Sequence, residues 1–296
     1  GDDCAVIDAK RLAISTDMSV EEVHFRREWL EPARIGRRAA IAALSDLAAV
    51  AARPLGALVS LAMPGTDPPE VGAEIMAGLR DAIEHAGATL LGGDLTRSPA
   101  PIVIDVVVLG DVERPILRSG ARPGDSLWVT GTLGGAESAV SDLLDGRTPD
   151  PAALLAFIAP TARIDEALWL AERDVLHAMI DLSDGLAGDA GHLAAASSAR
   201  IIVDGPALPV HPAARAHGDD AALALALGGG DDYELCFAAA PHAVEALRDE
   251  FTRTFGVPLT RVGEVVEGSG VVLRDNDGRL RGMPVEGFSH FTRVAT

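Results

Sequence analysis

One pattern recurs along this chain and limits its folding more than any other: an apolar run that leads directly into aspartate, with glycine or a hydroxyl residue beside it. In the clearest instance the apolar run 175–180 continues into 181–185 (Asp-Leu-Ser-Asp-Gly), before an Ala-rich helical pattern over 186–197. This order predicts a buried strand that ends in acceptor oxygens at the mouth of a sheet. Oxygen ligands grouped so tightly suit a hard cation such as Mg²⁺. The alternative is that Ser183 or Asp184 simply caps the following helix.

The same pattern returns twice, and a further acid interrupts a predicted helix. The segments 12–17 (Leu-Ala-Ile-Ser-Thr-Asp) and 88–94 (Ala-Thr-Leu-Leu-Gly-Gly-Asp) both pass from apolar residues to an acid, which predicts two more strands that end there. Asp46 lies in the middle of an Ala-rich helix predicted over 32–52, with the nearby arginines at the other end. It is either a solvated surface acid or a buried carboxylate that needs a partner.

These acids come from separate segments that only folding could bring together. The set comprises Asp3, Asp17, Asp46, Asp94, Asp181 and Asp184. Taken singly, each has an ordinary explanation as a cap or turn residue. If they converge, mutual repulsion raises the pKa of several of them unless cations bind. Carboxylates filled by Mg²⁺ are the usual means of neutralising a polyphosphate during phosphoryl transfer, so the pattern favours that chemistry.

Composition excludes several other classes of protein. The formal net charge is −19, which argues against a nucleic acid as partner, because binding to phosphate backbones needs the opposite sign. Lys10 is the only lysine and has no glycine-rich loop around it. Neither a P-loop nor a protein-kinase site can therefore be built, since each requires a lysine in a defined context. Any phosphate must be handled by metal ions, arginines and backbone amides.

Length and the order of elements predict an α/β (α+β) protein of two domains. The chain has 296 residues, which fits about two domains. A turn cluster after Arg118 sets the predicted boundary, with an amino-terminal domain over 1–117 and a carboxy-terminal domain over 118–296. We expect no membrane span and no secretory segment, although the start at Gly1 without methionine suggests trimming. The only cysteines, Cys4 and Cys236, are far apart and fit a reducing, cytoplasmic location.

Seven motifs in order resemble the thiamine-monophosphate kinase family over nearly the whole chain. They are Gly1-Asp2-Asp3, Ile14-Ser15-Thr16-Asp17-Met18, Leu44-Ser45-Asp46-Leu47-Ala48, Gly92-Gly93-Asp94, Arg118-Ser119-Gly120-Ala121-Arg122-Pro123-Gly124-Asp125, Asp181-Leu182-Ser183-Asp184-Gly185 and Gly229-Gly230-Asp231-Asp232-Tyr233-Glu234-Leu235. Any one of them is weak, whereas the ordered set is specific. That family shares its fold with aminoimidazole ribonucleotide synthetase, selenophosphate synthetase and a hydrogenase maturation protein.

The resemblance implies direct transfer of the γ-phosphoryl group of ATP to thiamine monophosphate, giving thiamine diphosphate and ADP. It implies ATP and Mg²⁺ as cofactors, and a homodimer whose amino-terminal domains pair through their sheets. The implied magnesium ligands are Asp3, Ser15, Thr16, Asp17, Asp46, Asp94, Asp181 and Asp184. The implied catalytic residues are Asp17, Asp46, Asp94 and Asp181. The implied nucleotide contacts are Ser15, Gly93, Asp94, Arg118 and Ser183, and the implied acceptor contacts are His24, Asp231 and Phe288.

Four departures from the family pattern leave alternatives open. Asp231 replaces the usual Glu, Leu95 a common Thr, and Phe288 a Trp or Tyr, while 133–136 (Leu-Gly-Gly-Ala) replaces Gly-Asp-Ser-Ala. His24 could equally be a surface histidine and Phe288 a satellite core residue. One alternative keeps the fold but changes the acceptor, as in aminoimidazole ribonucleotide synthetase or the hydrogenase maturation protein. The other is a protein that binds ATP without turnover.

Overall fold

The computed structural model describes residues 11–285 and divides into two units. The first unit extends to Pro115 and also includes Ile158–Leu168, and the second comprises Ile116–Phe157 and the described residues from Trp169 onward. The assignment of domains to 1–117 and 118–296 stays a prediction. Two of the predicted site residues, Asp3 and Phe288, lie outside the described residues.

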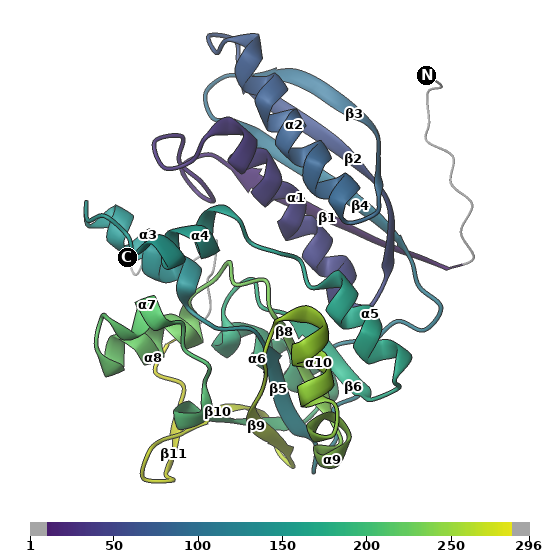
Figure 1. The fold of residues 1–296 in the computed structure, drawn as a ribbon, viewed down its shortest axis with the longest axis vertical. Coiled ribbons are helices and arrows are strands. Elements are labelled where there is room, and N and C mark those ends of the chain that lie inside the picture. Colours follow the sequence, from purple (N-terminus) through teal and green to yellow (C-terminus); the bar gives the residue numbers. More distant parts are fainter. Residues whose placement is uncertain (1–10, 286–296) are drawn as a thin grey trace. The chain divides into compact units, whose positions relative to one another are not determined.

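The first unit is a four-stranded sheet with helices on one face (Figure 1). In chain order its elements are β1 (Leu12–Val20), α1 (Pro32–Ala49), β2 (Arg53–Pro64), α2 (Pro69–His85), β3 (Thr89–Ser98) and β4 (Val103–Asp111). The strand order is β1-β4-β2-β3, in which β2 and β3 are parallel and the other neighbours antiparallel. Pro occupies the first turn of both helices, where its missing N–H has no helical partner to lose.

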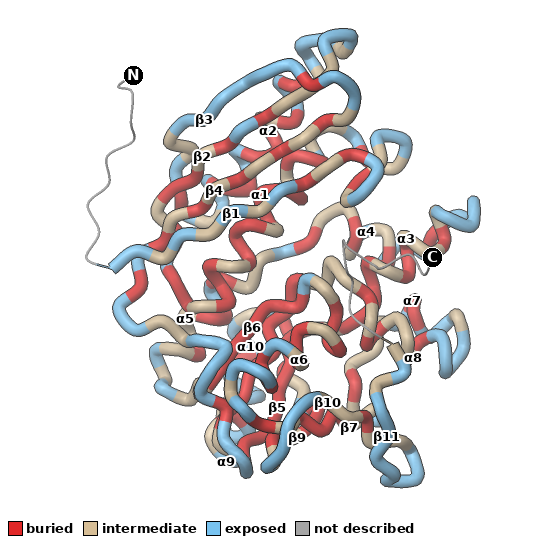
Figure 2. The backbone as a smooth tube through the Cα atoms, turned by 180° about the vertical axis from the view of Figure 1, so that it is seen from behind, coloured by how far each residue is buried: buried red, intermediate tan, exposed pale blue. Residues whose placement is uncertain are grey.

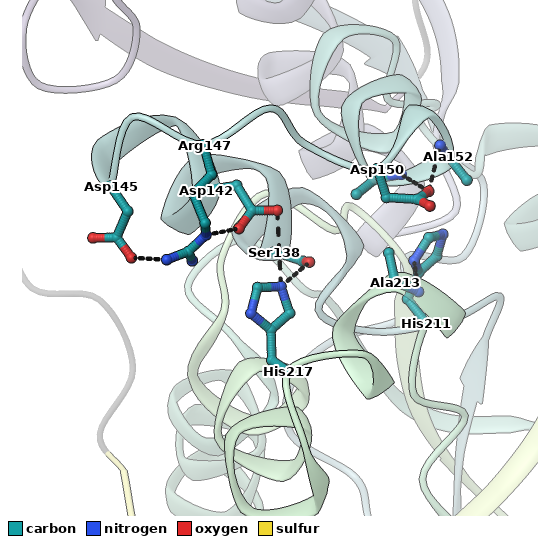
Figure 3. A network of polar contacts seen from close by, with 10 residues as sticks. Ser138, Asp142, Asp145, Arg147, Asp150, Ala152, His211, Ala213 and His217 are labelled. Carbon is teal, nitrogen blue, oxygen red and sulfur yellow. Dashed lines mark hydrogen bonds and ion pairs between the residues drawn. The ribbon is translucent and has the colours of Figure 1, made fainter.

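Burial alternates along β4, a central strand of the first unit, because only one face of the sheet is covered. On β4, Ile104, Val106 and Val108 are fully buried, while the residues between them keep part of their surface exposed. This is the period of two expected for a sheet packed on one side. Figure 2 shows the strands from the side opposite the helices, where exposed and intermediate positions alternate along most of β1, and intermediate and buried positions alternate along β4.

Two of the predicted strands end later than the sequence suggested. β1 continues through Ser15, Thr16 and Asp17 to Val20, and β3 continues through Gly93 and Asp94 to Ser98. The prediction that these acids follow the ends of their strands is therefore wrong. Their polar character reflects a position on the edge strands β1 and β3, whose side chains reach solvent, and not a strand terminus.

The second unit is a seven-stranded mixed sheet. Its strands are β5 (Ser126–Thr130), β6 (Leu176–Asp181), β7 (Arg200–Asp204), β8 (Leu235–Ala239), β9 (Leu259–Val266), β10 (Gly270–Arg274) and β11 (Leu280–Gly282). Their order is β11-β10-β7-β9-β5-β8-β6, and β7 with β10 is the one parallel pair among them. Its helices are α3 (Gly135–Leu144), α4 (Pro151–Ile158), part of α5 (Ile164–Glu172), α6 (Leu186–Ser197), α7 (Pro212–Arg215), α8 (Asp219–Gly228), α9 (Pro241–Glu245) and α10 (Arg248–Phe255), with a 3₁₀ turn at Gly205–Ala207.

Helices cover both faces of the sheet around β5 and β8. Every residue of these two central strands is buried, as expected when both faces are packed. Leu127 and Val129 join the core beneath α6, whereas Trp128 points to the other face, where the Arg248 guanidinium of α10 lies 5.9 Å from its ring. No helix among residues 11–285 is long and apolar enough to cross a membrane. The core beneath α6 also includes Ile180 and Leu182, which flank Asp181 at the end of β6.

Candidate functional site

The end of β6 gathers acidic side chains within the second unit. Asp181 is the last residue of the strand and is 3% exposed, Ser183 is exposed and Asp184 half-buried. Asp189, in the first turn of α6, is 2% exposed and accepts a hydrogen bond from the Asp184 backbone N–H at 3.1 Å. The strand predicted to end at Asp181 is confirmed, and α6 begins at Leu186 as predicted. Two of the predicted ligands, Asp181 and Asp184, therefore share one place in the fold.

The electrostatics of this cluster favour a bound cation. Burial raises the pKa of Asp189 to about 8, and repulsion from Asp181 and Asp184 adds to the rise. Arg118 opposes the rise, so its guanidinium lies within electrostatic reach of the same carboxyl group. The donors are all oxygens, which suits Mg²⁺, and a divalent ion would relieve the crowding of negative charge. The residues at this position fit the ion chemically.

Arg118 is held beside β6 by its own backbone. The Leu117 carbonyl accepts the Met179 N–H at 3.0 Å, and the Arg118 carbonyl accepts the Ser197 hydroxyl at 3.0 Å. These bonds attach the start of the second unit to both β6 and the end of α6. Arg118 and Ser183, both expected to contact the nucleotide, thus lie on segments attached to the same strand and helix.

The loop before β8 lies along the loop after β6. Backbone hydrogen bonds join Leu182 N–H to the Glu234 carbonyl at 2.8 Å, Tyr233 N–H to the Leu182 carbonyl at 2.8 Å, and Asp231 N–H to the Ser183 carbonyl at 3.0 Å. The predicted acceptor contact Asp231 is therefore attached directly to the predicted nucleotide contact Ser183.

Acidic groups also surround the start of α3. Both carboxylate oxygens of Asp232 accept the Gly134 N–H, at 3.1 and 2.9 Å, which caps that helix. Burial of its carboxyl group raises the pKa of Asp232 well above the ordinary value. Burial, with repulsion from Asp231, likewise raises the pKa of Glu137 in the first turn of α3. Asp232 is a structural acid, whereas Glu137 faces the predicted acceptor contact.

In the first unit, the predicted ligands divide between the two faces of the sheet. The Ser15 hydroxyl donates to Asp46 Oδ2 at 2.5 Å, which joins β1 to α1 on the helix-covered face. Asp17, two residues along β1, shares that face. The Thr16 hydroxyl points to the opposite face and donates to Asp105 Oδ1 at 2.7 Å. Asp46 is half-buried and has a hydrogen-bond partner. It therefore lies between the two alternatives, a solvated surface acid and a buried carboxylate with a partner.

Asp94 lies on the open face of the same sheet. The register pairs Asp94 with Ser60, and Ser60 with Asp105, so these side chains share the face that carries Thr16. Gly93 has a packing reason to be glycine, because a Cβ there would lie 1.8 Å from the Val59 carbonyl oxygen. A larger residue therefore does not fit at Gly93, directly before Asp94.

His24 lies in the loop after β1. Its Nδ1 accepts the Val20 N–H at 3.0 Å, which places the proton of the neutral ring on Nε2. The ring is half-exposed. A donor nitrogen held in this way suits contact with an anion such as a phosphate.

The structure adds acids that the sequence patterns missed and limits the metal site. Asp189 and Asp105 interrupt an apolar helix and an apolar strand, the same signal that singled out Asp46. Within residues 11–285, no three His, Cys, Asp or Glu side chains are already arranged to hold a metal ion. The full magnesium ligand set stays a prediction.

Family models match both parts of the chain. The model described as AIR synthase related protein, N-terminal domain, matches residues 1–112, and the corresponding C-terminal domain model matches 122–276. A thiamine-monophosphate kinase of Salmonella typhimurium is 37% identical, over 98% of this chain and 91% of that protein.

Solved structures agree with the sequence relatives. The structure of AaThiL complexed with AMPPCP and TMP matches with a TM-score of 0.83 at 31% identity, covering 95% of this chain and 87% of that one. A hydrogenase maturation protein, E. coli HypE, matches with a TM-score of 0.83 over all of this chain and 93% of that one, but at 22% identity. The second likeness shows the fold alone.

Proposed function

This chain belongs to the thiamine-monophosphate kinase family. We propose that its aspartates hold the magnesium ions that assist the phosphoryl transfer. The chain is an ATP-dependent phosphotransferase that converts thiamine monophosphate to thiamine diphosphate. The observation that carries this conclusion is the identity of more than one third over almost the whole length of the kinase from Salmonella typhimurium.

The reaction needs positioning and charge neutralisation more than a strong base. The attacking group is a phosphate oxygen of thiamine monophosphate, already an anion, and it bonds to the γ-phosphorus as the bond to the bridging β–γ oxygen breaks. ADP leaves with the electron pair of that bond. Magnesium, when bound, neutralises the charge of the phosphates that are brought together. A covalent phospho-enzyme is not required.

The residues take their roles from the family pattern, and the local geometry supports them. Asp181 and Asp184 would hold magnesium at the end of β6, and Asp17 on β1, Asp46 on α1 and Asp94 on β3 would serve the same purpose. Further ligands in the proposal are Asp3, Ser15 and Thr16. Arg118 and Ser183 would contact the nucleotide. The backbone of Arg118 is held by Ser197, and its long side chain carries a guanidinium that suits phosphates. His24 donates from Nε2 to the acceptor phosphate, and Asp231 and Phe288 meet the rest of the acceptor.

A homodimer is part of the proposal. β1 exposes 62% of Ile14 and 55% of Met18 on the open face of the sheet, and Ile14 pairs there with Leu109 of β4. Apolar side chains on the face opposite the helices support pairing of two such sheets, because an exposed apolar patch of this kind favours association. We also propose a cytoplasmic location, supported by Cys236, a free and buried thiol.

A turnover assay with a panel of acceptors tests the function. Purified protein with ATP and Mg²⁺ is given thiamine monophosphate, thiamine or formylglycinamidine ribonucleotide, and the products are separated by chromatography. We expect thiamine diphosphate with the first acceptor and no product with the others. Turnover of another acceptor alone would favour the same-fold alternative, and ATP binding without any product would favour a non-catalytic protein.

A further inference from the structure

The loop before β8, residues 229–234, which we call the acceptor loop, contains two residues in a strained backbone conformation. Asp231 and Tyr233 have φ values of +64° and +49°, in the left-handed region that side chains other than glycine seldom occupy. Such strain persists only where the surrounding structure holds it, and it is concentrated at functional sites. Here the backbone bonds to Leu182 and Ser183 hold it, as part of the pairing between the two loops.

The Tyr233 side chain holds the Asp231 carboxylate by a hydrogen bond. Its hydroxyl donates to Asp231 Oδ1 at 2.8 Å, and only 6% of the residue is exposed. Because the ring is buried, the hydroxyl has little freedom to move. Tyr233 is also the only tyrosine in the chain.

The Asp231 carboxylate has a reason to turn away if this hydrogen bond is lost. Glu137 lies close enough that Asp231 contributes to its raised pKa. A Cβ on Gly229 would meet the Glu137 Cβ at 2.7 Å, so Glu137 is packed against the acceptor loop and cannot easily withdraw. The hydroxyl of Tyr233 therefore offsets repulsion between two neighbouring acids as well as orienting one of them.

We propose that Tyr233 is a positioning residue for the acceptor, whose hydroxyl fixes the Asp231 carboxylate in the orientation that meets thiamine monophosphate. The inference rests on the proposed role of Asp231 in the family reaction. The strained turn and the bonds to Leu182 and Ser183 keep this carboxylate in register with the loop that ends at Asp184. Backbone hydrogen bonds thus join the two loops that carry the proposed acceptor and nucleotide contacts of the second unit.

Calorimetric titration with thiamine monophosphate, in the presence of AMPPCP and Mg²⁺, tests the proposal on four proteins. They are the wild type, Tyr233→Phe, Asp231→Ala and the double variant. Tyr233→Phe should weaken binding of thiamine monophosphate about tenfold, the size expected for a hydrogen bond to a carboxylate. In the Asp231→Ala background it should cause no further loss, because a residue that acts through another has no separate effect. Binding of AMPPCP should not change.

The control is Thr254→Val, which removes another hydroxyl of the second unit, one that donates to the Glu250 carbonyl on α10 at 2.8 Å. It should leave the affinity unchanged. Wild-type affinity in Tyr233→Phe, or an equal loss in both backgrounds, would overturn the inference, as would a wild type that does not bind thiamine monophosphate. Tyr233-dependent binding without any turnover would instead overturn the kinase function and leave the inference standing.

A second measurement does not depend on the folding of the Phe variant. With 3-fluorotyrosine in place of the single tyrosine, ¹⁹F NMR reports on Tyr233 alone. Thiamine monophosphate should shift this resonance in the wild type and leave it unmoved in Asp231→Ala. A resonance that does not move in the wild type would contradict the proposal.

Discussion

The surroundings of a single aspartate decide whether it serves catalysis or affects stability. Asp46 and Asp189 are both acids within helices, yet their surroundings differ. Asp46 is half-buried and accepts a hydroxyl, whereas Asp189 is almost fully buried beside two other carboxylates. The first is expected to act in catalysis and the second to couple stability to pH. Each of these expectations can be tested with an isosteric Asp→Asn change.

Asp46→Asn should abolish turnover without unfolding the protein. Asn keeps an oxygen that can accept the Ser15 hydroxyl, so this hydrogen bond is kept while the charge is lost. We expect kcat to fall by at least about a hundredfold, as when one electrostatic contact to a transition state is removed, with the melting temperature unchanged. Asp81→Asn, which alters an exposed acid paired with Arg37, is the control and should retain full activity. An active Asp46→Asn would remove Asp46 from the site.

Asp189 should make the protein less stable as the pH rises. Its folded-state pKa is about 8, against an ordinary value of 3.8 that the unfolded chain should have, so between these values the folded state holds a proton that the unfolded state releases. With respect to this group, stability is greatest below pH ~4 and falls by up to about 1.4 kcal/mol per pH unit until pH ~8.

Urea unfolding of wild type and Asp189→Asn across this range, without magnesium, measures the effect. Asn can still accept the Asp184 N–H, so the variant should show a flatter dependence on pH and greater stability at pH 8. Parallel curves for the two proteins would show that Asp189 titrates normally.

The helices α1 and α2 pack closely against each other. A Cβ on Gly36 would lie 1.9 Å from the Ile75 carbonyl oxygen, and one on Gly78 would lie 1.9 Å from that of Ala33. The two helices therefore cross at a pair of glycines, where no larger residue fits. Both glycines lie inside their helices and not at an end. Each is required by the close contact between the two helices.

Alanine at these glycines should destabilise the first unit. Ala favours helix formation over Gly, yet the clash at Gly36→Ala or Gly78→Ala should cost about 1–3 kcal/mol of unfolding free energy. Gly191→Ala in α6 is the control, since a Cβ there meets nothing within 4 Å, and it should stabilise by up to about 1 kcal/mol. Denaturant titration decides, and stabilisation by Gly36→Ala would contradict the close crossing.

Local signals predicted some elements well and misplaced others. The apolar run of β6, which ends at Asp181, and the Ala-rich pattern of α6 lie where the sequence placed them, because composition and the glycine between them agree there. The ends of β1 and β3 were misplaced, since a polar residue on the open side of a sheet resembles one beyond a strand end. The same ambiguity hid the division of Ser15 and Thr16 between two faces, which depends on which side the helices cover.

For the whole molecule, the open face of the first sheet predicts self-association. Ile14→Glu places a charge on the exposed face of β1 and should convert a dimer to a monomer in sedimentation velocity. Leu280→Glu on β11, a residue 52% exposed in the second unit, is the control and should leave the mass unchanged. A wild type that sediments as a monomer at micromolar concentration would contradict the proposed dimer.

The most direct test of magnesium-assisted transfer uses ATP labelled with ³²P in its γ-phosphoryl group. In a single turnover with thiamine monophosphate and Mg²⁺, we expect the label to pass into thiamine diphosphate, with none on the protein and no transfer once the metal is chelated. Label trapped on the protein, released only as inorganic phosphate, or transferred equally well without a divalent ion would contradict direct transfer at an aspartate-bound metal.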